Sequence, residues 1–437
     1  MDPIIAGIVG IIAFFILLIF RMPVSYAMVI VGFAGFAHLT SPLKAFNVVA
    51  RDFYSIFSSY SLTVAPMFIL MGFIAYYSGI GMGLFNLVNK FVGHLRGGLA
   101  LSVQAACALF GAVCGSLPAT VATMGSIALP EMKKYKYADS LSTASVAAGA
   151  SLGSLIPPSV LFIIYGIATE QSIGRLFIAG IIPGLLHMSI YMITILLLTT
   201  YKPSLAPITP KASWKERSGA IHDGGLIEVA MVFLLSLGGL FMGWFTPTEA
   251  GAVGAFSIFV ITFVEKKMDW PKLKLALADT TKLTAMIFLL VAGATVFGRF
   301  FAITRIPFEL SSWVAGLNMP PFLVMGVVIL IYFILGTVID ALALILLTIP
   351  IFYPLVVTTL GYDPIWFGVI ILLITSMGVM TPPVGLNVYI VKSVSKDVPL
   401  ETIFKGIWPF VLADVVTITI LIAFPVIATI LPDLLFN

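Results

Sequence analysis

The stretch ALFGAVCGSLPATVATMGSIALPEM, residues 108–132, decides the fold of this chain. The apolar region that contains it runs over 98–132, which is too long for a single membrane span of about 20 residues. Its middle carries Gly115-Ser116-Leu117-Pro118, a combination that interrupts a helix. A helix broken inside a bilayer frees backbone groups that lipid cannot satisfy, so the break must lie within protein or against a water-filled cavity. We therefore predict a re-entrant hairpin over 98–132, which enters the membrane and leaves it on the same side.

The composition places this hairpin in an all-α polytopic membrane protein. Of the 437 residues, 60% are hydrophobic and only 10% are charged, and the mean hydropathy is +1.13. Soluble domains carry about 25% charged residues, so a soluble fold is excluded, as is a disordered chain. We predict about ten transmembrane helices, at 4–20, 22–39, 60–78, 138–167, 176–200, 226–244, 247–264, 283–303, 364–391 and 406–431.

A second hairpin and a repeated order of elements indicate two matching halves. Residues 320–356 form another apolar stretch too long for one span, interrupted by Gly336 and Asp340. A shift of 225 residues superimposes Gly111 on Gly336, Thr123 on Thr348, Ser151 on Ser376, Gly153 on Gly378, and Pro157-Pro158 on Pro382-Pro383. We predict a first repeat over 1–200 with a broken helix at 138–167, a cytoplasmic linker over 201–224, and a second repeat over 225–437 with a broken helix at 364–391. Because each half has five full crossings, the second copy is expected to be inverted, as in many secondary transporters.

The distribution of basic residues predicts the orientation of the chain. Most of the 23 lysines and arginines fall in loops on one side of the predicted membrane. Cytoplasmic loops are enriched in these residues. We therefore expect both the N-terminus and the C-terminus on the outer side.

The four helix breaks are the expected ion sites. Freed carbonyls, hydroxyls and carboxylates are the hard ligands that Na⁺ prefers, and the scarcity of His and Cys at the breaks argues against a transition metal. The first expected Na⁺ site comprises Gly115, Ser116, Thr120, Ser151 and Ser154. The second expected Na⁺ site comprises Thr337, Asp340, Ala341, Gly378, Thr381 and Asn387. The alternative for each single hydroxyl or glycine is close helix packing.

Asp340 is the strongest single candidate. An unpaired carboxylate inside the membrane costs roughly 2.5–3.5 kcal/mol, and a bound cation would offset that penalty. The alternatives are a protonated acid or an ion pair with Arg299 or Arg305. Arg299 suits a substrate carboxylate, which a guanidinium can hold through two hydrogen bonds, or it snorkels to the outer surface.

Half-helix N-termini favour anions because their dipoles are positive at that end. The residues expected beside an anionic substrate are therefore Arg299 and the two Pro-Pro breaks, Pro157, Pro158, Pro382 and Pro383. By contrast, Glu249, in the first turn after Pro247, is expected to cap a helix or to contact another subunit. The sequence assigns no role to Asp414.

Four segments carry a resemblance to a known family. The hairpin at 108–132, AAGASLGSLIPPSV at 147–160, GWFTPTEAGAVGA at 243–255 and SMGVMTPPVGLNVY at 376–389 occur in order over nearly the whole chain. Together they resemble the large membrane subunit of tripartite ATP-independent periplasmic (TRAP) transporters.

The resemblance implies sodium-coupled import of a small organic acid, such as a C4-dicarboxylate or a sialic acid, across the bacterial inner membrane. It also implies two partners, a small membrane subunit and a periplasmic substrate-binding protein, and an elevator mechanism.

Other classes of protein remain as alternatives or are disfavoured. A stand-alone sodium-coupled carrier of dicarboxylates or other anions is the main alternative, because it would share the same repeat architecture. An intramembrane enzyme is disfavoured because the chain has no HExxH motif, and an ATP-driven pump because it has no GxxxxGK[ST] loop. A purely structural subunit is the last alternative. Nothing in the charge pattern indicates a nucleic-acid partner, since the basic residues lie in short loops.

Overall fold

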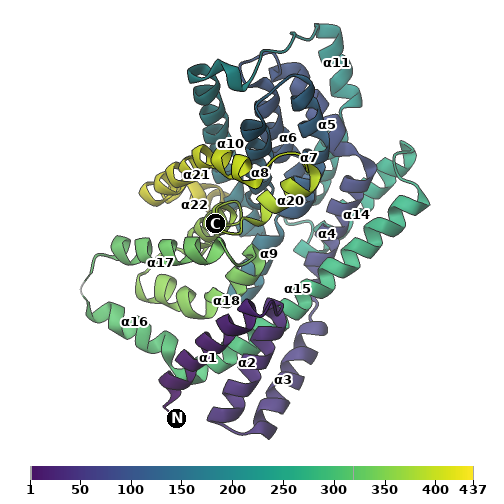
Figure 1. Cartoon of the computed structure of the whole chain (residues 1–437). Helices are drawn as coiled ribbons and strands as arrows, with labels where there is room; N and C mark the ends of the chain where they lie inside the picture. Colours follow the sequence, from purple (N-terminus) through teal and green to yellow (C-terminus); the bar gives the residue numbers. More distant parts are fainter. Residues whose placement is uncertain (1, 318, 437) are drawn as a thin grey trace.

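The computed structural model describes residues 2–317 and 319–436, and the regular elements in these ranges are helices (Figure 1). Up to the predicted linker they are α1 (Pro3–Ile19), α2 (Val24–Leu39), α3 (Pro42–Phe57), the 3-10 turn η1 (Ser61–Thr63), α4 (Val64–Ser78), α5 (Ile80–Val92), α6 (Gly98–Cys114), α7 (Leu117–Lys134), α8 (Asp139–Leu155), α9 (Val160–Thr169) and α10 (Ile173–Tyr201). The linker region contains the 3-10 turn η2 (Pro203–Leu205) and a short helix, α11 (Trp214–Asp223).

The second part of the chain has a similar order of elements. They are α12 (Leu226–Phe233), the π-helical turn η3 (Leu234–Gly238), α13 (Gly239–Phe241), α14 (Pro247–Val264), α15 (Trp270–Thr304), α16 (Ile306–Gly316), α17 (Pro321–Gly336), α18 (Ala341–Tyr353), the π-helical turn η4 (Pro354–Thr359), α19 (Pro364–Gly378), α20 (Leu386–Val394), α21 (Leu400–Ala423) and α22 (Val426–Leu435).

Short polar side chains explain where several of these helices begin. Ser159 accepts a hydrogen bond from the Phe162 amide and starts α9, immediately after the first Pro-Pro sequence. Thr246 and Glu249 form a reciprocal capping box at the start of α14, with Pro247 in the first turn. Such caps satisfy amides that have no partner within the helix. The capping role expected for Glu249 is therefore confirmed.

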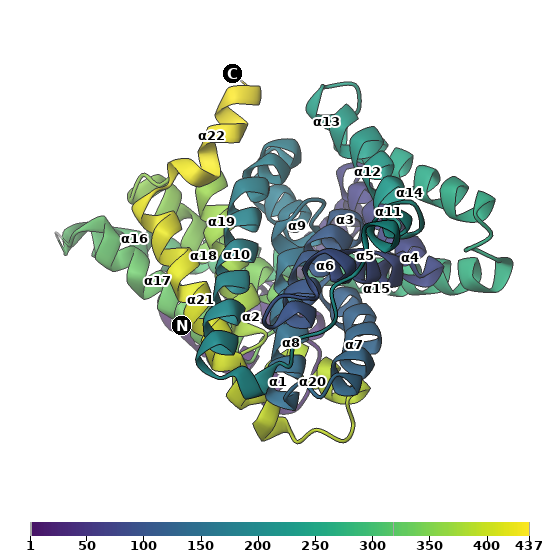
Figure 2. The same ribbon diagram turned by 90° about the horizontal axis from the view of Figure 1, so that it is seen from above.

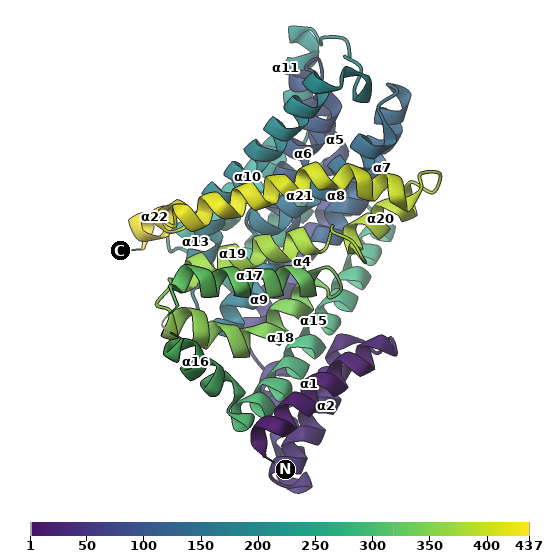
Figure 3. The same ribbon diagram turned by 60° about the vertical axis from the view of Figure 1, so that its left-hand side comes forward.

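The helices pack as two groups. The frame group consists of α1–α4, α14 and α15, in which α15 packs along α2 and α4, and α4 packs along α14. The hairpin group contains the two hairpins, the two broken helices and the helices packed on them. In this group α6 and α7 pack on α8, α17 packs on α19, and α21 packs on α8, α10 and α19. In Figure 1, α15 runs from the end of the molecule that holds α1–α3 toward the end that holds α5–α7. Figure 2 shows α16–α17 and α11–α14 on opposite sides, and Figure 3 shows the long α21 running beside α19.

Each of the two segments predicted as hairpins consists of two helices with a break near the expected position, while their re-entrant insertion into the membrane stays a prediction. α6 and α7 meet at the first tip, residues 115–116, and α17 and α18 meet at the second tip, residues 337–340. The first broken helix is the pair α8 and α9, which is bent by 43°. The second is the pair α19 and α20, interrupted over 379–385. Both Pro-Pro peptide bonds are cis.

Each hairpin contacts its broken helix through a pair of glycines. A Cβ placed on Gly111 would lie 2.6 Å from the Cα of Gly153, and one on Gly378 would lie 2.7 Å from the Cα of Gly336. These two contacts are related by the 225-residue shift found in the sequence. The shared contact supports the repeat, while the inverted insertion and the 1–200 and 225–437 boundaries stay predictions.

The helices differ from the ten predicted spans in length and continuity. Among the described residues, six helices are long and apolar enough to cross a membrane, or up to eight if each bent pair is one span. The predicted spans at 4–20 and 22–39 form helices of 17 and 16 residues, and the one at 364–391 is split into helices of 15 and 9. The predicted span at 283–303 lies within α15, which has 35 residues and begins at Trp270. The predicted span begins at residue 283 because the residues before it are more polar. A fall in hydropathy does not by itself end a helix, and α15 extends back to Trp270.

The glycine contact predicts a specific loss of stability. Gly378→Ala forces the α19 backbone away from α17, and overpacking of this kind typically lowers the free energy of unfolding by about 1–3 kcal/mol. The measurement is the melting temperature of the detergent-solubilised protein. Gly326→Ala is the matched control, because that glycine lies on α17 but an added Cβ would meet no described residue beyond its own helical turn within 4 Å. Equal melting temperatures for the two variants would contradict the importance of the contact.

Candidate functional site

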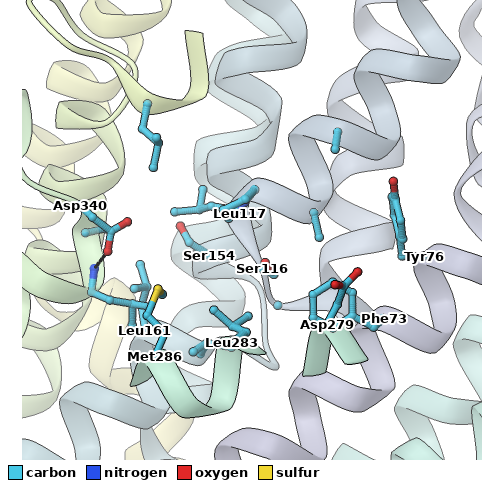
Figure 4. Close-up of a pocket in the computed structure, with 18 of the residues that line it drawn as sticks. Phe73, Tyr76, Ser116, Leu117, Ser154, Leu161, Asp279, Leu283, Met286 and Asp340 are labelled. Atoms are coloured by element: carbon cyan, nitrogen blue, oxygen red, sulfur yellow. Dashed lines mark hydrogen bonds between the residues drawn. The ribbon is translucent and has the colours of Figure 1, made fainter. Parts of the chain in front are cut away.

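A cavity of about 500 Å³ lies where both hairpin tips and both broken helices meet (Figure 4). The first tip contributes Gly115 and Ser116, and α8 contributes Ser154. The second tip contributes Asp340 and Ala341, and the second broken helix contributes Val379 and Asn387. The opposite wall comes from the frame group, from α4 and α15. In Figure 4, Asp340 and Asp279 lie on opposite sides of Ser116 and Ser154.

The first tip is held against the first Pro-Pro break by backbone contact. Gly115 has a φ of +60°, and a Cβ there would lie 2.4 Å from the carbonyl oxygen of Pro158. The Gly115 carbonyl in turn accepts a hydrogen bond of 3.4 Å from the Val160 amide. A residue with a side chain would be strained here and would also collide with the break. The tip therefore requires glycine for two independent reasons.

The second tip is built around Asp340. Its Oδ1 accepts hydrogen bonds from the amides of Leu342 at 3.0 Å and Ala343 at 3.4 Å, so the carboxylate caps α18. The Thr337 carbonyl accepts from the Val384 amide at 3.2 Å, which joins this tip to the second Pro-Pro break. No lysine or arginine of the described residues pairs with Asp340, and its side chain is open to the cavity.

Polar contacts join the two halves behind the cavity. The hydroxyls of Ser154 on α8 and Ser376 on α19 lie 2.8 Å apart. Asn387 Nδ2 donates to the Ala147 carbonyl at 3.1 Å. Asn387 is buried, and its Oδ1 has no partner among the described residues. An unpartnered buried oxygen on Asn387 and the Asp340 carboxylate, which line the same cavity, are oxygen ligands that fit a hard cation such as Na⁺.

The structure brings together six of the residues expected in the two ion sites. Those that line the cavity are Gly115, Ser116, Ser154, Asp340, Ala341 and Asn387. The others lie in the surrounding layer and do not line it: Thr120, Ser151, Thr337, Gly378 and Thr381. In that layer the hydroxyls of Thr120, Thr337 and Thr381 donate to backbone carbonyls of their own segments. These three contacts agree with the alternative role of single hydroxyls, which is close helix packing. The prolines Pro157, Pro158, Pro382 and Pro383 also do not line the cavity.

Arg299 lies away from this cavity and has a different partner. Its Nε and Nη2 donate to the two carboxylate oxygens of Asp52 on α3, at 2.8 and 3.0 Å. This two-bond contact links α3 to α15, and Asp52 is buried whereas half of the Arg299 side chain is exposed. The ion pair between Asp340 and Arg299 or Arg305 that was one alternative is not formed. Arg299 therefore does not line the cavity that contains Asp340, and its expected contact with a substrate carboxylate stays a prediction.

Sequence reasoning missed the polar residues on the opposite wall. Asp279 and Lys282 on α15 line the cavity, together with Tyr76 and Tyr77 on α4. The Tyr77 hydroxyl donates to Asp279 Oδ2 at 2.5 Å, and Lys282 Nζ lies 3.2 Å from Asp279 Oδ1. Both charged residues precede residue 283, where the predicted span begins, and the sequence pattern therefore predicts a loop at their positions. The charged pair next to an apolar run was the signal that could have identified them.

The sequence comparisons assign the chain to a family of transporter permeases. Residues 11–427 match the family described as "Tripartite ATP-independent periplasmic transporter, DctM component". The chain therefore belongs to the DctM family of large TRAP transporter permeases, which is not an enzyme family. This membership and the apolar helices make it an integral protein of the inner membrane.

Individual relatives agree with this assignment. The C4-dicarboxylate TRAP transporter large permease protein DctM of Pseudomonas aeruginosa is 36% identical over 377 residues, which cover 86% of each chain. The sialic acid TRAP transporter large permease protein SiaM of Vibrio cholerae is 32% identical over 419 residues, or 96% of each chain. Among solved structures, the YdaH transporter of Alcanivorax borkumensis has a similar fold, with a TM-score of 0.60 at 16% identity over 89% of this chain and 90% of that one.

The hydrogen bonds at the second tip predict how substitutions of Asp340 affect stability. Asp340→Ala removes the α18 cap and should lower the free energy of unfolding by about 1 kcal/mol. Asp340→Asn keeps an acceptor oxygen and should unfold close to the wild-type temperature. Melting temperatures of the purified variants test the difference. If Asn were as damaging as Ala, the charge rather than the cap would be responsible for stability.

Proposed function

We propose that this chain is the membrane subunit of a sodium-coupled importer of a small organic acid, and that substrate and Na⁺ are bound at the cavity between the hairpin tips. The observation that carries the proposal is the convergence of both tips and both helix breaks on one cavity. Broken helices that meet at the midplane are the typical ion and substrate sites of secondary transporters. The acid is a C4-dicarboxylate, a sialic acid or a related carboxylate.

The cation side of the proposal rests on the oxygen donors of the hairpin group. Asp340 supplies a carboxylate that has no basic partner among the described residues, and Asn387 supplies an unpartnered buried carbonyl oxygen. Ser116 and Ser154 supply oxygens near the first tip. Carboxylate, carbonyl and hydroxyl oxygens suit Na⁺, and a bound cation would offset the penalty of an intramembrane carboxylate.

The anion side of the proposal rests on the frame group. Lys282 is the basic residue in the described cavity wall, and its side chain is largely exposed. The ammonium has three N–H donors, and one of them donates to Asp279. The remaining donors are available to a carboxylate that occupies the cavity.

The two walls suggest how transport proceeds. One wall belongs to the hairpin group and the other to the frame group, so movement of the hairpin group along α4 and α15 would carry the bound solutes across the membrane. We include in the proposal the two inverted repeats, the elevator motion and an orientation with both termini in the periplasm. The partners are a small membrane subunit and a periplasmic substrate-binding protein, in keeping with the tripartite family.

Uptake by proteoliposomes tests the proposal as a whole. The chain is reconstituted with the small subunit, and uptake of a C4-dicarboxylate or a sialic acid is measured with and without an inward Na⁺ gradient and the binding protein. We expect uptake only when both are present. Uptake without the binding protein would instead establish the stand-alone carrier. Uptake that ignores Na⁺ would refute the coupling.

In the same assay, Asp340→Asn should abolish the response to Na⁺, because it removes the charge and keeps the helix cap. The matched control is Asp363→Asn at the start of α19, where the carboxylate caps a helix in the same way, through a hydrogen bond of 2.8 Å from the Trp366 amide. Asp363 does not line the cavity, so its variant should respond to Na⁺ as the wild type does. Sodium-dependent uptake by Asp340→Asn would remove this residue from the cation site.

Substitution of Lys282 tests the anion side. Lys282→Gln should raise the KM for the acid at least about tenfold, the factor expected from loss of a charged hydrogen bond, with a smaller effect on the maximal rate. Lys274→Gln serves as the control because Lys274 lies on the same helix but faces the Trp270 ring. An unchanged KM for Lys282→Gln would show that the substrate carboxylate is bound elsewhere.

A further inference from the structure

A chain of buried polar side chains leads from the cavity into the contact between α10 and α21. Ser154, which lines the cavity, donates to the Ser151 carbonyl at 2.6 Å. The Ser151 hydroxyl lies 3.2 Å from the hydroxyl of Tyr191, and Tyr191 donates to Asp414 Oδ1 at 2.6 Å. His187 Nε2 lies 2.7 Å from the same Oδ1. Ser151, Tyr191, Asp414 and His187 are each at most 1% exposed.

The positions of the hydroxyl protons follow from the acceptors. A hydroxyl carries one proton, whereas carbonyl and ionised carboxylate oxygens only accept. Tyr191 gives its proton to Asp414, and Ser151 gives its own to the Ala148 carbonyl at 2.6 Å. No proton is left for the 3.2 Å contact between Ser151 and Tyr191. Two oxygens therefore face each other there, and the lone pairs of Ser151 Oγ receive no hydrogen bond from Tyr191.

This arrangement depends on Asp414. Without an acceptor at that position, the Ser151 oxygen, 3.2 Å away, can accept the proton of the Tyr191 hydroxyl. Tyr191 would then donate to Ser151 Oγ and direct its partial positive charge at that oxygen. A donor on a ligand oxygen competes with a cation for the same lone pair.

We propose that Asp414 is a positioning residue for the first cation site: by accepting the Tyr191 proton, it leaves Ser151 Oγ free to coordinate Na⁺. The inference rests on the proposed sodium coupling and adds Ser151, which lies behind the cavity-lining Ser154, to the oxygens of the first site. It gives a role to an intramembrane carboxylate that does not line the cavity. His187 supplies the second contact to Oδ1, while Asp414 Oδ2 has no partner among the described residues.

The test is a double-mutant cycle on the purified complex of large and small subunits. The Na⁺ concentration that gives half of the Na⁺-dependent rise in melting temperature is measured first, because a ligand that binds the native state raises its stability. The maximal uptake rate is measured in parallel. Asp414→Leu should raise the half-effect Na⁺ concentration by roughly threefold to tenfold, the range expected for one misdirected hydrogen bond, with a smaller change in the maximal rate.

The other members of the cycle separate positioning from general damage. Tyr191→Phe removes the competing donor, so its half-effect concentration should stay within about twofold of the wild type. The double variant Asp414→Leu with Tyr191→Phe should return to the value of Tyr191→Phe. Asp414→Asn keeps an acceptor oxygen and should also resemble the wild type. Thr417→Val is the matched control, since Thr417 is buried on α21 and donates to Ala413.

Two results would overturn the inference while sodium coupling stands. One is an unchanged half-effect concentration in Asp414→Leu, and the other is a double variant as impaired as Asp414→Leu alone, which would indicate structural damage. If Asp414→Leu does not fold, Asp414→Asn and Tyr191→Phe still test it, because a large increase in either contradicts the proton assignment. A wild-type protein with no response to Na⁺ would overturn both this inference and the proposed coupling.

Discussion

The constraint on which the rest of this structure depends is the need to satisfy backbone groups at helix breaks within a membrane. Four segments interrupt their helices, and each hairpin tip meets the Pro-Pro break of its own half. The Gly115 carbonyl is satisfied by the Val160 amide and the Thr337 carbonyl by the Val384 amide. Breaks satisfied in this way can face a cavity without exposing backbone to lipid. The position of the cavity is thus a consequence of how the breaks pair.

Much of this arrangement could be predicted from the sequence, because breaks in apolar segments have local causes. Glycine, proline and a charge are visible in the sequence, so the helix breaks at 115–116 and 337–340 could be predicted, while the re-entrant insertion of 98–132 and 320–356 stays a prediction. The 225-residue shift anticipated the two glycine contacts as well. Six expected ion-site residues line the cavity for the same reason: they belong to the breaks themselves.

The remaining features depend on contacts between distant segments, which periodicity does not reveal. Arg299 was expected near the substrate, but α3 brings Asp52 to it, and α3 was not among the predicted spans. Asp279 and Lys282 reach the cavity because α15 extends beyond its apolar part. The link from Asp414 to Ser151 passes through Tyr191 on a third helix. Sequence spacing contains no information about such a link.

The glycine pairs described for the fold have a mechanical consequence. Where Gly111 meets Gly153, and where Gly336 meets Gly378, the two helices touch through their main chains, with no side chain between them. Side chains can change rotamer and allow neighbouring helices to slide, but main-chain atoms in direct contact have no such freedom. Each hairpin and its broken helix should therefore move together as one rigid unit.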